Sequence, residues 1–371
     1  MTSKDFFEFV STQYKKQLPF VVYRKPNRED VKAMLQKTDD LYLIEDFTQR
    51  GFVFSPFDDI EPSILIPKEH SEIIAVSSVP TVDVEARELK PSSEENGKEN
   101  HVNLVKKGIE AISEDKFKKV VLSRKETVQL KENNPIEIFK RLLSSYKSAF
   151  VYCWYHPKIG IWLGATPETL IKIEGSQFSI MALAGTQKYE GSLNVLWQEK
   201  EKQEQQYVTD FILENLKPSV ESLKVSDVET VKAGNLVHLR TMISAQLKKG
   251  IPLKEVIDAL HPTPAVCGLP KDVAKQFILK HENYHRGFYT GYLGELNLDK
   301  SIKPRSGRRN IENRAYAFSK QSTQLYVNLR CMQIQDNHAI IYVGGGITKS
   351  SNPEKEWDET EAKSLVIKNV L

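Results

Sequence analysis

Hydrophobic positions fall mostly into short runs separated by turn residues, a pattern typical of strands, and a few segments show helical spacing instead. Apolar residues recur at helical spacing over 102–112, and Asn134 and Pro135 form a good start for a helix over 136–146. Successive strands are predicted at 119–130, 149–155, 160–165, 169–175 and 177–185. Because the turns between the last four of these strands are short, they predict an antiparallel meander and not alternating βαβ units.

The last part of the chain also mixes helices and strands. A long charged helix is predicted at about 194–216, and the apolar runs at 325–334 and 338–347 predict a hairpin. Asn352 and Pro353 then form the start of a C-terminal helix.

The first part of the chain is less regular. Residues 1–80 predict a helix followed by a small β-rich region, and the polar stretch 80–101 predicts an exposed connector. This connector is the best candidate for a domain boundary, but a surface loop inside one domain explains it equally well. A length of 371 residues fits two or three domains of roughly 150 residues each.

Composition narrows the class of protein. Lys and Arg total 52 against 49 for Asp and Glu, a formal charge of +3 that argues against a dedicated nucleic-acid binder. Cys153, Cys267 and Cys331 are far apart and form no CxxC pair, as expected in a reducing cytoplasm. The N-terminus has no apolar signal region, and no run approaches the roughly 20 apolar residues that span a bilayer. We therefore expect a cytoplasmic protein without membrane or nucleic-acid partners.

One segment departs from the even charge balance. The stretch 300–320 concentrates basic side chains against the single acid Glu312; they are Lys300, Lys303, Arg305, Arg308, Arg309, Arg314 and Lys320. Such runs usually form solvated loops, and contact with RNA, phosphate or a partner is the alternative.

Paired carboxylates are the first candidate for chemistry. Glu201 and Glu204 share one face of the charged helix, and Glu356, Glu359 and Lys363 share one face of the C-terminal helix. Two such helices can jointly hold Mg²⁺, which prefers oxygen ligands. Taken alone, the spacing favours two exposed helix faces.

Glycine-bearing turns and isolated polar residues are the other candidates. The glycines occur in GATPE (164–168), LAGT (183–186) and VGGGI (343–347), and none of these is a phosphate-binding loop. Lys119, His238 and Arg330 interrupt apolar strands. Taken singly, each glycine segment predicts an ordinary turn, and each polar residue predicts a solvent-facing or hydrogen-bonded strand position.

Together, these motifs resemble the chorismate-utilising enzymes, which include isochorismate, salicylate, anthranilate and aminodeoxychorismate synthases. The matching motifs are, in order, KVVLSR, GATPE, ALAGT, an E-x-x-E helix, LVHL, HPTPAVCG, RGFYTGYLGEL, NLRCMQI, VGGGI and NPEKEWDETEAK. The resemblance covers 102–371, and residues 1–101 match only loosely. It implies an α/β (α+β) fold with large, mainly antiparallel sheets flanked by helices around a central cleft, and one catalytic unit over 1–371.

Three positions separate the branches of the family. Lys119 matches the lysine general base of the water-using enzymes, whereas anthranilate synthases have glutamine there. Ala184 replaces the lysine of aminodeoxychorismate synthases, and Ala265 resembles isochorismate synthases. The resemblance thus implies an isochorismate synthase, an isomerase that adds water at C2 of chorismate while the 4-hydroxyl departs. A salicylate synthase, or a binding protein that keeps the fold without turnover, is the alternative.

The resemblance also assigns the catalytic pair. Lys119 is the general base and Glu168 the general acid, on opposite sides of the substrate ring. A lysine and a glutamate that work near neutral pH need pKa values moved from their ordinary values of about 10.4 and 4.3. Burial moves both in the required direction, because it disfavours the charged form.

The metal ligands and substrate contacts are implied in the same way. Glu204 and Glu359 are direct ligands of Mg²⁺, and Glu201 and Glu356 act through water or complete a ring of carboxylates. Arg330 binds the pyruvyl carboxylate in bidentate fashion. The other substrate contacts are Tyr289, Gly185, Thr186, Gly344, Lys363, His238 and Ala265. No redox cofactor and no glutaminase subunit are expected, and the chain is expected to be a monomer or a weak dimer.

Two departures from the family pattern accompany these assignments. Gln205 follows Glu204 where many relatives have histidine, and the basic segment 300–320 resembles an insertion. Cys267, where serine is common, is predicted to pack in the interior, because nothing nearby indicates a reactive thiolate.

Overall fold

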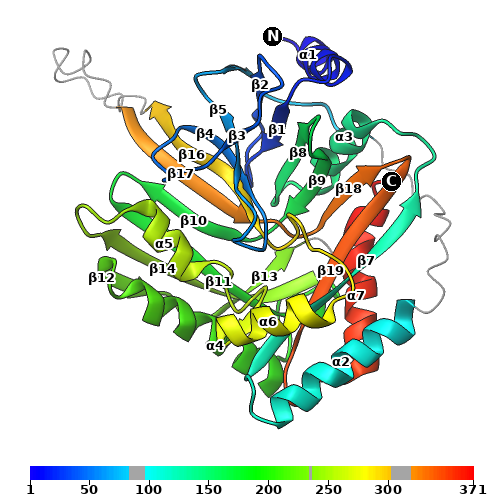
Figure 1. The fold of residues 1–371 in the computed structure, drawn as a ribbon, viewed down its shortest axis with the longest axis vertical. Helices are drawn as coiled ribbons and strands as arrows, with labels where there is room; N and C mark the ends of the chain where they lie inside the picture. Colours follow the sequence, from blue (N-terminus) through cyan, green and yellow to red (C-terminus); the bar gives the residue numbers. More distant parts are fainter. Residues whose placement is uncertain (83–96, 234–235, 302–318) are drawn as a thin grey trace.

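The computed structural model describes residues 1–82, 97–233, 236–301 and 319–371 (Figure 1). Most of the predicted connector 80–101 and of the basic segment 300–320 therefore lies outside the described residues. Within the described part of the chain, no helix is both long enough and apolar enough to cross a membrane.

The fold is built on two large sheets, and every strand pair among the described residues is antiparallel. The nine-stranded sheet has the order β15 (Gly268–Leu269), β7 (Lys119–Gln129), β19 (His338–Ile347), β18 (Cys331–Gln335), β9 (Gly160–Thr166), β8 (Phe150–His156), β1 (Phe20–Arg24), β2 (Val31–Gln36) and β6 (Ser71–Val76). The ten-stranded sheet has the order β12 (Val220–Val225), β14 (Leu236–Leu247), β11 (Gln177–Lys188), β10 (Thr169–Glu174), β17 (Ser319–Val327), β16 (Tyr292–Ser301), β4 (Gly51–Ser55), β5 (Ile64–Pro67) and β3 (Tyr42–Leu43), with β13 (Glu229–Ala233) paired to β14.

Helices cover the outer faces of the sheets (Figure 1). They are α1 (Ser3–Lys15), α2 (Gly97–Ser113), α3 (Pro135–Ser145), α4 (Glu199–Leu216), α5 (Leu253–Leu260), α6 (Lys271–His281) and α7 (Pro353–Lys368). The predicted helix starts are confirmed: Asn134 accepts a hydrogen bond from the amide of Glu137, and Asn352 accepts from those of Glu354 and Lys355. The predicted fold class, with mainly antiparallel sheets flanked by helices, is confirmed.

Strand β1 shows how the core is divided. All five of its residues are buried. Because side chains alternate across a strand, Phe20 and Val22 pack in one cluster with α1 and α3, while Val21 and Tyr23 pack in a second cluster that joins the two sheets. Strand β1 pairs with β8, and β4 pairs with β16, so the first hundred residues contribute strands to both sheets.

The predicted continuous meander is wrong at one point. Strands β8 and β9 pair, and β10 and β11 pair, but β9 and β10 belong to different sheets. Pro167 and Glu168 form the crossing, where the proline has no amide hydrogen to continue a ladder. This crossing carries Glu168 to the place where the two sheets meet.

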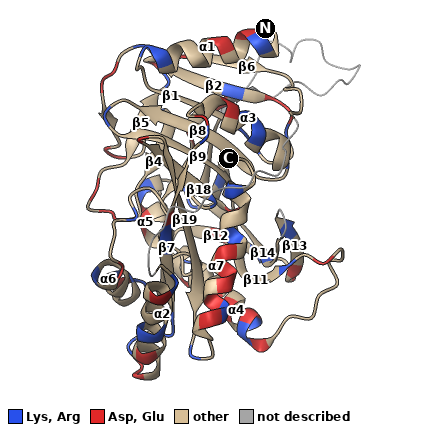
Figure 2. Cartoon of the chain, turned by 90° about the vertical axis from the view of Figure 1, so that its right-hand side faces the viewer, with Lys and Arg blue, Asp and Glu red and all other residues tan. Residues whose placement is uncertain are grey.

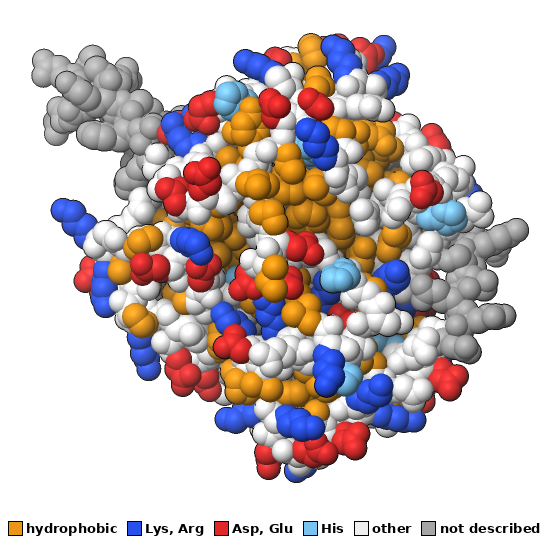
Figure 3. Space-filling model, viewed as in Figure 1, with side chains coloured by type: hydrophobic (Ala, Val, Ile, Leu, Met, Phe, Trp, Pro, Cys, Tyr) orange, Lys and Arg blue, Asp and Glu red, His pale blue; other side chains and the backbone are white. Residues whose placement is uncertain are grey.

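The charged helix also starts later than predicted, at Glu199 instead of about 194. Glu201 accepts a hydrogen bond from the amide of Gln198 in a capping box, which fixes the first turn of α4. Acidic side chains gather on α7 and α4 (Figure 2). On the face shown in Figure 3, acidic and basic side chains are otherwise interspersed.

Candidate active site

A pocket lies where both sheets meet α4 and α7, and most of the predicted site residues line it. The predicted residues on its wall are Glu168, Gly185, Thr186, Glu204, His238, Ala265, Tyr289, Arg330, Gly344, Glu359 and Lys363. Lys119, Glu201 and Glu356 lie outside the wall. The branch position Ala184 also lines the pocket. The rest of the lining was not assigned a role from the sequence; it consists of Val121, Pro167, Leu183, Val266, Thr290, Leu329, Tyr342, Val343, Gly345 and Gly346.

Glu168 is a buried acid, only 4% exposed. Its backbone carbonyl accepts a hydrogen bond from the amide of Val327, and the hydroxyl of Thr166 donates to the Val327 carbonyl, so the crossing is tied to β17. Burial raises the pKa of Glu168 to about 8, although the positive charges of Lys119 and Arg330 oppose the shift. The carboxyl group therefore holds its proton at neutral pH and can donate it.

Lys119 opens β7, and its side chain is fully buried. Its ammonium lies 2.8 Å from Glu204 Oε1, in an ion pair that lacks the alignment of a hydrogen bond. Gly346 lies on the adjacent strand β19, in register with Val121. A Cβ on Gly346 would lie 3.0 Å from Lys119 Cε and would overlap the Glu204 carboxylate, so this contact requires a glycine.

The glycine segments VGGGI and LAGT are therefore not the ordinary turns that the sequence predicted for each of them alone. Gly344, Gly345 and Gly346 lie inside strand β19, and LAGT (183–186) lies inside β11. The ladder between β11 and β14 shifts register after Ala184, and Gly185 has a φ of +71°, a left-handed conformation that glycine adopts readily. The bulge turns the Gly185 carbonyl toward the pocket residue His238.

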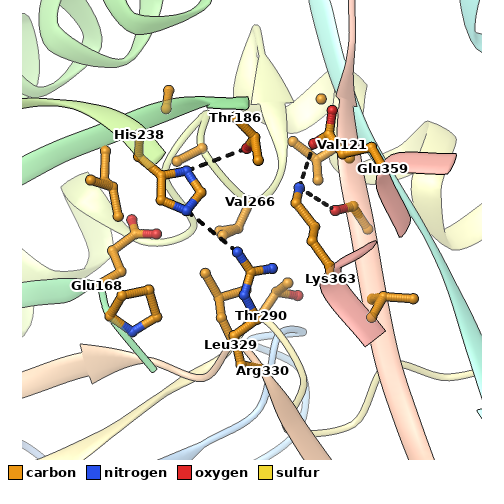
Figure 4. Close-up of a pocket in the computed structure, with 18 of the residues that line it drawn as sticks. Val121, Glu168, Thr186, His238, Val266, Thr290, Leu329, Arg330, Glu359 and Lys363 are labelled. Carbon is orange, nitrogen blue, oxygen red and sulfur yellow. Dashed lines mark hydrogen bonds and ion pairs between the residues drawn. The ribbon is translucent and has the colours of Figure 1, made fainter. Parts of the chain in front are cut away.

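His238 links the bulge to Arg330 (Figure 4). Its Nδ1 donates to the Gly185 carbonyl at 2.9 Å and lies 3.3 Å from the Thr186 hydroxyl. Burial, together with the nearby Arg330 charge, lowers the pKa of His238 to about 3, so the ring is neutral. With the proton on Nδ1, Nε2 is an acceptor that faces Arg330 Nη2 at 3.5 Å. His238 therefore orients the guanidinium.

Two cations face the pocket from opposite elements. Arg330 follows β17 with a φ of +49°, and burial lowers the pKa of its guanidinium. Lys363 on α7 lies 2.6 Å from Glu359 Oε1 and donates to the Gly344 carbonyl at 2.8 Å. A ligand with two carboxylates would satisfy both cations, and Tyr289 lines the same wall.

The acidic residues divide into two groups. Glu204, Glu356 and Glu359 each pair with a lysine, and the partner of Glu356 is Lys200, which the motifs did not reveal. Its helical spacing of four residues from Glu204 would have predicted a pair with Glu204 instead, so no local signal indicated this contact. The Glu201 carboxylate instead caps the start of α4.

The carboxylates of Glu356 and Glu359 supply the oxygen ligands that a hard cation prefers. Glu356 is 2% exposed, and its Oε2 is buried with no hydrogen-bond partner. A Cβ on Gly345 would lie 3.4 Å from this oxygen and 3.7 Å from Glu359 Oε1, so the glycine leaves room beside both carboxylates. Burial and the neighbouring Glu359 charge raise the pKa of Glu356, although the positive charge of Lys200 opposes the shift. As placed, however, no group of three or more His, Cys, Asp or Glu side chains among the described residues is close enough to hold a metal.

Gln205, the departure from the family pattern, has a structural position. Its side chain is buried and donates to the Ala182 carbonyl and the Thr241 hydroxyl, each at 3.1 Å. These bonds tie α4 to β11 and β14 and so fix the helix that carries Glu204. Cys267 is buried, as predicted.

Comparison with known families decides the classification. A family profile described as chorismate binding enzyme matches residues 53–303, and a second profile with the same description matches 315–369. The chain belongs to the chorismate-binding enzymes.

Named relatives in this family are 27–28% identical to the chain over the aligned residues. Isochorismate synthase MenF of Pasteurella multocida is 28% identical over 323 residues, which cover 82% of this chain and 70% of that protein. Isochorismate synthase DhbC of Bacillus subtilis is 27% identical over 336 residues, 83% of this chain and 77% of that protein. The structure of MenF, the menaquinone-specific isochorismate synthase from Escherichia coli, has the same fold, with a TM-score of 0.76, 21% identity and coverage of 95% of this chain and 88% of that one.

Proposed function

We propose that this chorismate-binding enzyme is an isochorismate synthase, which adds water at C2 of chorismate while the 4-hydroxyl leaves from C4. One observation carries the proposal: the pocket contains a buried, protonated acid, Glu168, together with a buried lysine behind its wall and two cations facing inward. The names of the relatives and the branch positions Lys119, Ala184 and Ala265 support the same activity.

The proposed mechanism divides the reaction between the two sides of the pocket. Lys119 takes a proton from the attacking water, and Glu168 gives its proton to the departing hydroxyl, since hydroxide is a poor leaving group. Arg330 binds the pyruvyl carboxylate, held in orientation by His238. To act as a base, Lys119 must first give up its proton and leave its ion pair with Glu204.

We propose Mg²⁺ as the cofactor, held by Glu204 and Glu359 with Glu356 nearby. When bound, it would hold the ring carboxylate of the substrate and offset the charge of these acids. The carboxylate chemistry and the unpartnered Glu356 Oε2 support this proposal. Because water is the nucleophile, we expect no ammonia-donating subunit. We also expect the enzyme to work in the cytoplasm, where buried free cysteines stay reduced.

The proposed function is tested by incubating the protein with chorismate and Mg²⁺ and identifying the products by mass. Isochorismate is an isomer of chorismate, so the expected result is a new chromatographic peak with the same mass as chorismate. Salicylate with released pyruvate as the main product would instead establish the alternative synthase. No turnover would favour a binding protein.

Activity should fall as the pH rises above about 8. Glu168 must carry a proton to act as the acid, and its pKa of about 8 means that the protonated form is lost above that pH. The expected profile of kcat/KM, which reports the free enzyme, declines about tenfold per pH unit on this side. His238, whose pKa is about 3, adds no step between pH 5 and 9. A kcat/KM that is flat from pH 7 to 10 would contradict the role of Glu168.

Removal of the divalent cation should abolish turnover, and added Mg²⁺ should restore it. Glu359→Gln is expected to raise the Mg²⁺ concentration for half-maximal activity by about 10-fold or more, since losing even an outer ligand partner has that effect. The same shift should appear in the Mg²⁺ dependence of the melting temperature. Glu354→Gln is the matched control, because Glu354 lies on the same helix and its side chain is exposed. Equal Mg²⁺ dependence of Glu359→Gln and the wild type would exclude Glu359 as a ligand.

A further inference from the structure

A buried ion pair stands directly behind the pocket wall without lining it. Glu282 follows the last turn of α6, and Arg286 lies four residues later; both side chains are 2% exposed. Arg286 Nε donates to Glu282 Oε2 at 2.8 Å, and Nη2 donates to Oε1 at 2.6 Å. The pair is therefore a bidentate contact between two charges that are almost entirely removed from water.

The guanidinium uses all five of its N–H donors. Besides the two bonds to Glu282, Nη1 donates to the Val266 carbonyl at 3.0 Å and to the Thr290 hydroxyl at 3.2 Å, and Nη2 donates to the Val121 carbonyl at 2.7 Å. All three acceptors belong to residues that line the pocket (Figure 4). One side chain thus ties together three segments of the wall that are far apart in the sequence.

Each of these three residues is a close neighbour of a residue to which we assign a role. Val121 lies two positions after Lys119 on β7, Val266 follows Ala265, and Thr290 follows Tyr289. A shift of any of these backbone segments would move the adjacent site residue with it.

Two further observations show that surrounding contacts fix the backbone of this wall. Glu282 Oε1 also accepts hydrogen bonds from the amide and the hydroxyl of Ser123, both at 2.8 Å, which adds a second tie to β7. Thr290 has a φ of +61°, a left-handed conformation that is costly for a β-branched residue and persists only where surrounding contacts enforce it. Its bond from Arg286 is one of these contacts.

We propose that Arg286, held by Glu282, is a positioning residue that sets the placement of Lys119, Ala265 and Tyr289 around the substrate. The proposal rests on the proposed function for its kinetic consequence. Its structural content, that Arg286 holds three segments of the wall, does not depend on which product forms.

The test uses Arg286→Lys, which keeps the positive charge but has only three donors and no planar fork. Hydrogen–deuterium exchange should become faster in the segments 119–123, 263–268 and 288–291. The value of kcat per folded molecule should fall by about 10- to 100-fold, since small misplacements of reacting groups have effects of this size. KM should change by a smaller factor than kcat, because Arg330 and Lys363, the two cations that face the pocket, receive no bond from Arg286. Glu282→Asp, a milder change, should shift kcat and exchange in the same direction to a smaller extent.

Arg24→Lys is the matched control. Arg24 is also buried, donates to the carbonyls of Leu143 and Tyr146 at 2.7 Å each, and does not line the pocket. It should lower the melting temperature and leave kcat and the exchange of the three wall segments unchanged.

Each outcome decides the proposal. Faster exchange of the wall with an unchanged kcat would overturn it, and so would a loss of kcat without faster exchange. If Arg286→Lys does not fold, Glu282→Asp is judged by the same two measurements. A wild type that does not convert chorismate would refute the proposed function, and the exchange data would still decide whether Arg286 holds the wall.

Discussion

Glu168→Gln should lower kcat by at least about 100-fold, with little change in KM. The amide keeps the size of the side chain but has no proton to give to the departing hydroxyl, and general acid catalysis contributes roughly 10²- to 10⁴-fold. The decline of kcat/KM above pH 8 should disappear from whatever activity remains. Both effects are measured in steady-state assays with chorismate over a range of pH. Full activity of the variant would refute the role of Glu168.

The same substitution should make the folded protein more stable at pH 8. In the unfolded chain a glutamate loses its proton near pH 4.5, whereas folded Glu168 keeps it to about pH 8. The folded state therefore binds more protons in this window, and the contribution of Glu168 to stability falls as the pH rises from about 5 to 8. The glutamine variant has no such pH dependence. The free energy of unfolding of the variant minus that of the wild type should therefore be larger at pH 8 than at pH 5, by on the order of a few kcal/mol. Denaturant unfolding at the two pH values measures it.

Glu295→Gln is the matched control for the direction of this change in stability. Glu295 is also buried, but it lies outside the pocket and pairs with Lys25 at 2.5 Å. Burial alone would raise its pKa, yet Lys25 and Lys32 lower it below the ordinary value. Its charge therefore stabilises the fold above the unfolded pKa, and Glu295→Gln should lower stability at pH 8 with kcat unchanged.

Lys119→Ala should also lower kcat by at least about 100-fold, because the attacking water loses its general base. The variant leaves a gap beside Glu204, and a small alkylamine added to the solution should restore part of the activity with a rate that depends on the amine concentration. This rescue separates a chemical role from a structural one. Lys275→Ala is the control, since Lys275 pairs with Asp58 at 2.9 Å away from the pocket and should leave kcat unchanged. A fully active Lys119→Ala variant would exclude the lysine as base.

Helices and strands were predicted well where their formation depends only on residues close together in the sequence. Asn134 and Asn352 cap the helices that their side chains indicated, because capping depends on the first turn alone. The strand runs were also recognisable, since buried strands are apolar over their whole length, as β1 is. The partners of a strand depend on residues far along the chain. The sequence pattern therefore missed that Pro167 and Glu168 cross between two sheets.

The site was accessible from the sequence mainly through the order of its motifs. Spacing alone favoured exposed helix faces for Glu204 and Glu359, yet both line the pocket. Three glycines in a row predicted a turn, and only the close approach of Glu204 and Lys119 to β19 explains them as strand residues. Arg286 escaped notice because its importance lies in backbone acceptors from three distant segments, which no local pattern reveals.

The central claim, that this pocket adds water to chorismate, is tested most directly by running the reaction with Mg²⁺ in H₂¹⁸O. Isochorismate should form with one ¹⁸O atom in its ring hydroxyl at C2, because the new hydroxyl comes from solvent and the original one leaves. Recovery of unlabelled isochorismate would contradict the base role of Lys119 and the acid role of Glu168 together, since the hydroxyl would then have moved within the substrate.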